Sequence, residues 1–261
     1  LDRITSTVNY ALDRGLKVSV GGEDSSRADL DFLSRVVVAA EAAGAHRFRF
    51  ADTLGILDPF MTQDIFRRLC AETDIELEFH GHDDLGLATA NTLAAVRGGA
   101  THASVCVLGL GERAGNAALE EVVTALGETQ GRRTAVSLSR LDGLATMVAE
   151  AAGRPIPESK SIVGGSVFAH ESGIHVSGIL RDVGTYEALD PKRFGRERQI
   201  VLGKHSGRAA IRSMLHSVGL ESDHQRISES EIYHIHRSDI YYLHEEPAAH
   251  HNRSDGHNAT H

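Results

Sequence analysis

Two histidines, His80 and His82, have the residue type and the spacing to bind one metal ion. They follow an alternating apolar run from Ile75 to Phe79, a pattern typical of a β-strand. Side chains two residues apart on a strand point to the same face, so both imidazoles can reach a single divalent cation. A lone histidine is usually structural, but this pair ends a strand and is followed by acidic residues and a glycine. The pattern therefore predicts a metal site.

Other side chains that can do chemistry also stand directly after predicted strands. These are Glu23, Thr53 and the glycine-rich segment Gly109 to Asn116, which contains Glu112 and Arg113. The carboxyl ends of parallel strands meet at one edge of a sheet or one mouth of a barrel, where such folds build their sites. The distribution therefore predicts that these residues lie around the histidine pair.

Strand and helix patterns alternate along residues 1–130, which indicates βα units and a parallel sheet. We expect strands at 16–20, 47–51, 75–79 and 102–108, and helices at 1–14, 29–43, 59–73, 87–97 and 116–128. The predicted fold class is α/β, as the C-terminal half of a TIM (β/α)8 barrel, because a complete barrel needs eight strands. A doubly wound sheet would place ligands similarly, but no Gly-x-Gly-x-x-Gly follows a first strand.

After residue 130 the alternation stops, and we expect a linker and a small, mostly helical subdomain over residues 131–220. Its helices are predicted at 138–152 and 209–218, and its histidines His170 and His205 are interpreted as structural. Residues 221–261 hold half of the 16 histidines and no sustained apolar period, so we expect a disordered tail.

Bulk properties exclude several classes of function. The net charge of -9 gives nucleic-acid binding no electrostatic support. No apolar run approaches the roughly 18 residues of a membrane span. Two cysteines, Cys70 and Cys106, do not suggest a disulfide framework. We expect a cytoplasmic protein with neither a membrane nor a nucleic-acid partner.

Residues 1–220 resemble the metal-dependent acyl-CoA Claisen-condensing family, which contains isopropylmalate and homocitrate synthases. The resemblance rests on HGHDDLGLATANTLAAVRGGA (80–100), GLGERAGNAALEE (109–121), FADTLG (50–55), the Glu23-Asp24 loop, and the FAHESGIH (168–175) and GKHSGR (203–208) segments. The runs ATANTLAAVRGGATH and SIVGGSVFAHESGIHVSGIL favour the nitrogen-fixation branch of the homocitrate synthases.

The resemblance implies a role for each candidate residue. It implies a divalent metal (Mg, Mn or Zn) bound by His80, His82 and Asn116, and a 2-oxoacid whose carboxylate is bound by Thr53. It implies that His175 is the general base, with Glu23 and Tyr186 as its partners. The thioester would lie along Gly109, Glu112 and Arg113. The implied reaction condenses acetyl-CoA with 2-oxoglutarate to homocitrate and CoA in a homodimer. A metal chelated by the oxoacid would make its carbonyl more electrophilic, and a histidine of near-neutral pKa can accept the methyl proton.

Each of these residues also has a plainer interpretation. Glu23 and Asn116 are possible helix caps, Thr53 has the setting of a turn residue, Glu112 and Arg113 form a surface ion pair, and Tyr186 simply packs.

The chain also departs from the family pattern. The family's first strand, Asp-Thr-Thr-Leu-Arg-Asp-Gly, supplies a metal-binding aspartate and is not found here. We therefore expect the 261-residue chain to be inactive alone and its full-length parent to be active. The alternatives are a 2-isopropylmalate synthase, a lyase of the hydroxymethylglutaryl-CoA type, and an inactive remnant.

Overall fold

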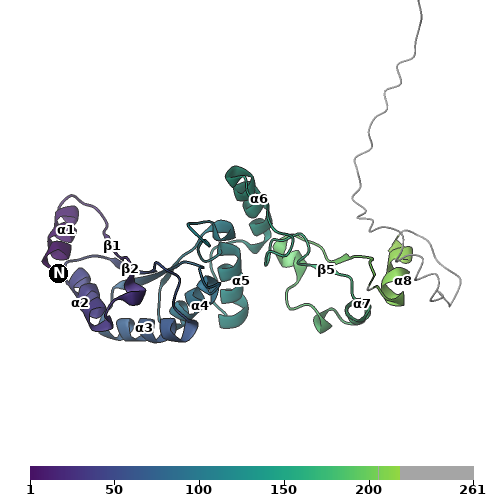
Figure 1. The fold of residues 1–261 in the computed structure, drawn as a ribbon, viewed down its shortest axis with the longest axis horizontal. Helices are drawn as coiled ribbons and strands as arrows, with labels where there is room; N and C mark the ends of the chain where they lie inside the picture. The colour runs from purple at the N-terminus through teal and green to yellow at the C-terminus, as the bar shows by residue number, and fades with distance from the viewer. Residues whose placement is uncertain (205, 218–261) are drawn as a thin grey trace, which may run out of the picture. The chain divides into compact units, whose positions relative to one another are not determined.

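The computed structural model describes residues 1–204 and 206–217, and these form two compact units. The first unit comprises Leu1–Val167 and Asp190–Glu197, and the second comprises Phe168–Leu189 and the described residues from Arg198 onward (Figure 1). The predicted tail, 221–261, and His205 lie outside the described residues. In the part of the chain that is described, no helix is long and apolar enough to cross a membrane.

The first unit is built from helices and strands in alternation, as predicted, and its α/β class is confirmed. Its strands are β1 (Ser19–Gly22), β2 (Arg47–Asp52), β3 (Glu76–Gly81) and β4 (His102–Ser104). Its α-helices are α1 (Asp2–Leu12), α2 (Leu30–Ala42), α3 (Pro59–Glu72), α4 (Ala88–Gly98), α5 (Leu119–Gln130) and α6 (Leu141–Ala152). Short 3-10 turns are η1 (Ser25–Arg27), η2 (Val107–Gly109), η3 (Leu138–Arg140) and η5 (Pro191–Phe194).

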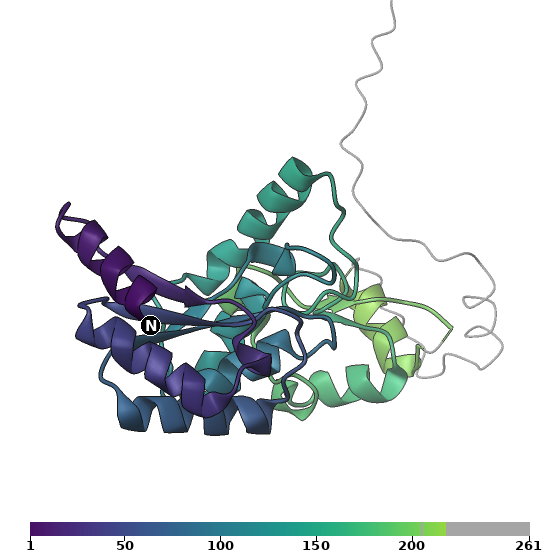
Figure 2. The ribbon, with the colours of Figure 1, turned by 60° about the vertical axis from the view of Figure 1, so that its left-hand side comes forward.

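The four strands form one parallel sheet in the order β1-β2-β3-β4. Alternation along the strands separates two faces. One face carries Phe48, Phe50, Leu77 and Phe79, which are at most 1% exposed and pack with Phe66 of α3. Helices cover this face of the sheet (Figure 2). The opposite face is polar, and on it Arg47 bonds the carboxylates of Glu76 and Glu78 on the neighbouring strand at 3.0 and 3.1 Å. The sheet thus has a hydrophobic side that packs on the helices and a polar side that carries charged side chains.

Two of the predicted strands differ from the observed ones. The strand expected at 16–20 begins only at Ser19, and the strand expected at 102–108 ends at Ser104. Beyond Ser104 the backbone turns into η2, where Leu108 takes a left-handed conformation (φ 59°). Cys106 instead forms an isolated bridge with Ala118, which delays the next helix from the predicted residue 116 to Leu119.

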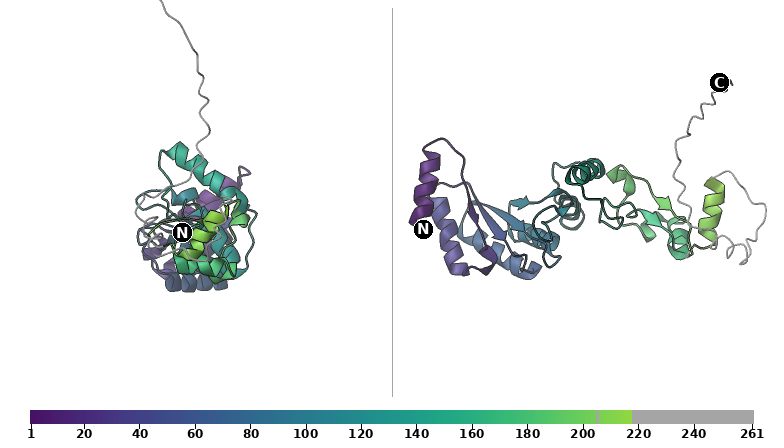
Figure 3. Two further views of the ribbon diagram at one scale, coloured as in Figure 1. Left: turned by 90° about the vertical axis from the view of Figure 1, so that its right-hand side faces the viewer. Right: turned by 45° about the horizontal axis from the view of Figure 1, so that its top comes forward.

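The second unit is small. It contains a parallel pair of two-residue strands, β5 (Ala169–His170) and β6 (Gln199–Ile200), with helices α7 (Gly173–Ile179) and α8 (Arg208–Ser217) and the turn η4 (Val183–Thr185) (Figure 3). Its boundary differs from the expected domain limit at residue 131, because α6 and the chain to Val167 belong to the first unit. Residues 190–197 return to the first unit, where Arg193 bonds Glu128 at 2.6 Å.

Truncating Phe79 to alanine should lower the free energy of unfolding by about 3–5 kcal/mol, because it leaves a cavity among aromatic rings. Phe79 is fully buried, and its ring lies 6.2 Å from that of Phe50 and 5.8 Å from that of Phe66. Urea unfolding followed by circular dichroism measures the effect. Phe60→Ala is the control, since Phe60 is 81% exposed and its loss should change stability by only about 0.5 kcal/mol. Equal effects of the two substitutions would contradict the packing described here.

Candidate functional site

The histidine pair lies at the carboxyl end of β3, on the polar side of the sheet. The rings of His80 and His82 are 5.0 Å apart at an interplanar angle of 83°. His82 stands one residue past β3 and forms an isolated bridge with Asn116. The structure therefore brings together the three residues that the resemblance assigned to the metal.

Two atoms of this group are buried and have no hydrogen-bond partner among the residues that the structure describes. They are Nδ1 of His82 and Oδ1 of Asn116. The Asn116 amide is oriented by its Nδ2, which donates to the carbonyl of Leu110 at 2.9 Å and to Sγ of Cys106 at 3.3 Å. Buried polar atoms normally have partners, so each such atom needs an explanation. An imidazole nitrogen and an amide oxygen are both common ligands of divalent cations, so these two residues fit a metal ion.

His80 is the third member of the group, and its surroundings favour the neutral imidazole. Burial lowers the pKa of His80 below its ordinary value, and the nearby charge of Arg49 adds to this effect. The neutral ring is the form that binds metals. Its Nδ1 lies 3.1 Å from Oγ of Ser104 on β4, a contact that orients the ring. Among the described residues no group of three or more His, Cys, Asp or Glu side chains could hold a metal ion.

A second polar cluster joins the loops after β1 and β2. The Glu23 carboxylate accepts hydrogen bonds from Arg49 at 2.7 Å and from the Thr53 hydroxyl at 3.3 Å. The same hydroxyl accepts a bond of 2.8 Å from the backbone N–H of Asp24, which has a left-handed φ of 54°. The charge of Glu23 also acts on His80, against the lowering of its pKa. Glu23 and Thr53 are therefore part of the same strand-end site as the histidines.

The plainer interpretations of Glu23 and Asn116 as helix caps are wrong. The cap of α2 is Asp29, whose carboxylate accepts from the Phe32 N–H at 2.8 Å. Helix α5 begins after Ala118 and has no side-chain cap at all. Both residues are thus left for other roles.

Arg113 connects three strand-end loops. Its guanidinium donates to the carbonyl of Thr53 at 2.5 Å and to both carboxylate oxygens of Asp84 at 2.8 and 2.9 Å. The hydrogen bond from Arg113 lowers the pKa of Asp84. Glu112 is a weak partner, at 3.9 Å and with its side chain 87% exposed, so the expected surface pair of Glu112 and Arg113 is not the main contact of this arginine. Sequence reasoning missed Asp84, although it stands directly after the histidine motif.

The glycine-rich loop after β4 is tightly folded against Asn116. Gly109 and Gly115 both have positive φ, 66° and 96°. A Cβ on Gly109 would lie 2.9 Å from the Asn116 carbonyl, and one on Gly115 would lie 2.0 Å from the Gly109 carbonyl. These positions require glycine because the backbone both turns left-handed and approaches itself closely.

The second unit carries the other predicted catalytic pair. The ring of His175 on α7 stacks on that of Tyr186 with centroids 4.3 Å apart and planes 30° apart. The adjacent Glu187 is nearly buried and accepts a bidentate pair from Arg198 and a 3.2 Å contact from His170. Glu187 thereby fixes the turn that holds Tyr186, a role that also explains His170 as structural. Glu23 lies in the first unit, so its pairing with His175 stays a prediction.

Comparison with known proteins shows the family of the chain. Residues 1–148 match the family described as HMGL-like, and residues 162–236 match a domain described as homocitrate synthase post-HMGL domain-like. The chain belongs to the HMGL-like family. Among solved structures it is similar to the HMG-CoA lyase of Bacillus subtilis, with a TM-score of 0.52 and 26% identity over 59% of this chain and 56% of that chain.

Curated relatives of this HMGL-like chain include named synthases. A 2-isopropylmalate synthase 2 of Caldanaerobacter subterraneus is 53% identical over 81% of this chain and 55% of its own length. Homocitrate synthase 1 of a Nostoc species is 48% identical over 84% of this chain and 58% of its own length. A homocitrate synthase of Frankia alni is 49% identical over 83% of this chain and 62% of its own length. The chain thus spans little more than half the length of the relatives it matches.

Proposed function

We propose that the whole protein is a synthase that condenses acetyl-CoA with a 2-oxoacid and releases CoA. The observation that carries this proposal is the pair of buried donor atoms on His82 and Asn116 beside His80, at the carboxyl ends of the parallel strands. The names of its relatives, 2-isopropylmalate synthase and homocitrate synthase, support the same class of reaction.

A divalent metal (Mg, Mn or Zn) would be held by His80, His82 and Asn116. When bound, it supplies Lewis-acid polarisation of the oxoacid carbonyl. Carboxylate and carbonyl oxygens of the substrate are ligands that all three ions accept.

The 2-oxoacid carboxylate would be bound by Thr53. Its hydroxyl donates to Glu23 over 3.3 Å, a long bond that a substrate carboxylate can replace at little cost. Arg49 would keep Glu23 in place during that exchange, because its own bond to this carboxylate is shorter, at 2.7 Å.

The proton of the acetyl methyl group would be removed by His175. Tyr186 stacks on this imidazole and restricts its rotation. The resemblance assigns Glu23 as the carboxylate that supports the base, and a neighbouring carboxylate makes an imidazole more basic. Hydrolysis of the condensed thioester would then release CoA and make the overall reaction favourable.

The four βα units are, in this proposal, the C-terminal half of a TIM barrel in a homodimeric cytoplasmic enzyme. The polar face of the sheet, with Arg47, Glu78 and His80, would then line the barrel interior. Two imidazoles and one amide form a weak set of metal ligands, so the 261-residue chain by itself should not catalyse the reaction.

The finer proposal is that the oxoacid is 2-oxoglutarate and the product homocitrate, as in the nitrogen-fixation branch. The alternative oxoacid is 2-oxoisovalerate, the substrate of a 2-isopropylmalate synthase, and it is favoured by the 53% identity to an enzyme of that name.

The test measures CoA release by the whole protein with acetyl-CoA and each oxoacid in turn, with added Mn²⁺. We expect release with 2-oxoglutarate to exceed release with 2-oxoisovalerate at least about tenfold, the discrimination that differing pocket contacts give. Greater CoA release with 2-oxoisovalerate than with 2-oxoglutarate would instead identify isopropylmalate as the product. Absence of release with every oxoacid, or release by the 261-residue chain alone, would contradict the proposal.

A further inference from the structure

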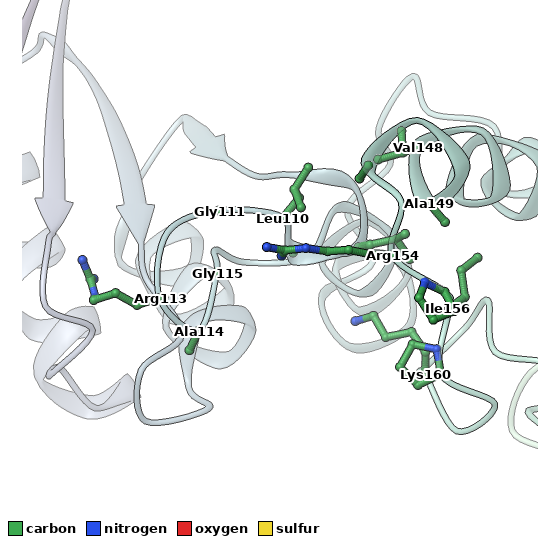
Figure 4. A pocket seen from close by; sticks show the side chains of 15 residues that line it. Leu110, Gly111, Arg113, Ala114, Gly115, Val148, Ala149, Arg154, Ile156 and Lys160 are labelled. Atoms are coloured by element: carbon green, nitrogen blue, oxygen red, sulfur yellow. The ribbon is translucent and has the colours of Figure 1, made fainter.

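The first unit has a cavity of about 270 Å³ between the glycine-rich loop and the end of α6 (Figure 4). Lys160 of its lining faces the carboxylates of Glu120 and Glu121, and the side chain of Arg113 points away from the cavity and bonds Asp84. The lining therefore has no net positive charge with which to select a ligand of its own. The second unit holds a more specific arrangement, around His175 and Tyr186.

Tyr186 is placed by its neighbours more than by burial of its ring. The residue is 40% exposed, so burial alone holds the ring only in part. In the structure the ring nevertheless stacks on the imidazole of His175, with the two centroids 4.3 Å apart. Two further residues of the second unit, Gly178 and Glu187, account for this position.

Gly178 provides the space in which the ring lies. It stands three residues after His175 on α7, so both positions share one face of the helix. A Cβ on Gly178 would lie 2.6 Å from Cε2 and 2.8 Å from Cδ2 of Tyr186, closer than real side chains approach. The backbone here is helical and has no left-handed φ. The glycine is therefore needed for the ring and not for the backbone.

Glu187 anchors the backbone from which the ring extends. Its side chain is only 5% exposed, and its carboxylate accepts hydrogen bonds from Nε and Nη2 of Arg198, the second at 2.6 Å. Nε2 of His170 lies 3.2 Å from the same carboxylate. The bonds from Arg198 lower the pKa of Glu187, which keeps the carboxylate charged at neutral pH. His170 belongs to β5 and Arg198 directly precedes β6, so Glu187 ties its neighbour Tyr186 to the paired strands.

We propose that Gly178 and Glu187 are positioning residues of the reaction, which together hold the Tyr186 ring on the imidazole of His175. The stacked ring restricts the side-chain rotation of His175, and a general base must be aligned with the proton that it removes. The inference rests on the proposed function in one respect, the role of His175 as the base. The placement of the ring is a property of the second unit alone. The family resemblance assigns no role to either positioning residue.

The test follows the His175 imidazole by NMR in the whole protein, prepared with isotope-labelled histidine. The Hε1 signal of His175 is identified by its absence from His175→Ala, and the stacked phenol ring should shift it upfield. Tyr186→Leu, which lacks the ring, gives the unshifted position. We expect Gly178→Ala and Glu187→Gln each to move the signal most of the way to that position.

The same two variants should lower kcat at least about tenfold and leave the KM for the oxoacid nearly unchanged, because misplacing a reacting group by about 1 Å can cost about 100-fold. Gly178→Ala separates this effect from a loss of folding. Alanine is a better helix former than glycine, so this variant should fold at least as well as the unaltered protein.

The matched control is Glu197→Gln, which makes the same change at an exposed glutamate next to Arg198. It should leave the His175 signal and kcat unaltered. An unmoved signal in Gly178→Ala or Glu187→Gln, or an equal shift in Glu197→Gln, would overturn the inference. A shifted signal with unchanged kcat would also overturn it if His175→Ala is inactive. If His175→Ala keeps full activity as well, the proposed function is wrong, whereas the shifted signal still supports the placement of the ring.

Discussion

Replacing His82 with alanine in the whole protein should abolish high-affinity binding of divalent cations and reduce condensation at least about 100-fold. Loss of even an indirect partner of a metal ligand costs about 10- to 100-fold, so loss of a ligand should cost more. The physical reason is that Nδ1 of His82 and Oδ1 of Asn116 are both buried with no hydrogen-bond partner in the described part of the chain, and that the two residues form a backbone bridge. Calorimetry with Mn²⁺ and Zn²⁺ measures the binding, and CoA release measures the reaction.

The control for this variant is His102→Gln. His102 lies on the neighbouring strand β4, on the same side of the sheet, but its Nε2 contacts the guanidinium of Arg47 at 2.6 Å and not the histidine pair. It should bind the cations as tightly as the unaltered protein does. If His82→Ala also retained full cation affinity, the proposed metal site would have to be abandoned.

The second large effect should follow from His175→Ala, which should lower kcat about 10²- to 10⁴-fold, the usual contribution of a general base. Metal binding should be unchanged, because His175 lies in the second unit and the metal-binding set in the first. The KM for the oxoacid should change little, since the imidazole acts on the acetyl methyl group. Steady-state kinetics at saturating metal separate these parameters.

Ile174→Ala is the matched control on the same helix, because Ile174 is 73% exposed and its loss should leave kcat near that of the unaltered enzyme. A kcat of His175→Ala within about threefold of the unaltered value would remove His175 from the reaction, because a general base contributes far more. A similar fall in both variants would indicate damage to α7 rather than loss of a base.

Local patterns in the sequence were sufficient to predict most of the first unit. The period of apolar residues changes from two to 3.6 at nearly every strand-to-helix junction, so α2, β2, α3 and α4 were placed to within about two residues. The end of β4 was not predictable in this way. Residues 105–108 continue an apolar run, but the chain leaves the sheet there because the buried Glu120 carboxylate holds the Leu108 N–H. That contact depends on a residue twelve positions further along.

The candidate site was predictable where the signal is local in the sequence, as the strands and helices were. The spacing of His80 and His82 is local and strongly informative, and the structure brings them together with Asn116. The partners that position the site come from distant segments. Arg49, Asp84 and Ser104 were not predicted because an ordinary strand or loop residue carries no signal of the side chain it will meet. The family resemblance predicts which residues act, whereas the contacts that hold them in place are seen only in the fold.

The interleaving of the two units constrains how this protein can be cut or fused. The chain passes between them after Val167, Leu189 and Glu197, so no single proteolytic cleavage can release either unit intact. A truncation at Val167 would discard Phe194, which is 2% exposed, and with it part of the first unit's own packing. Chimeras with related proteins should therefore exchange junctions on both sides of residues 190–197, or transfer the whole stretch from residue 168 onward.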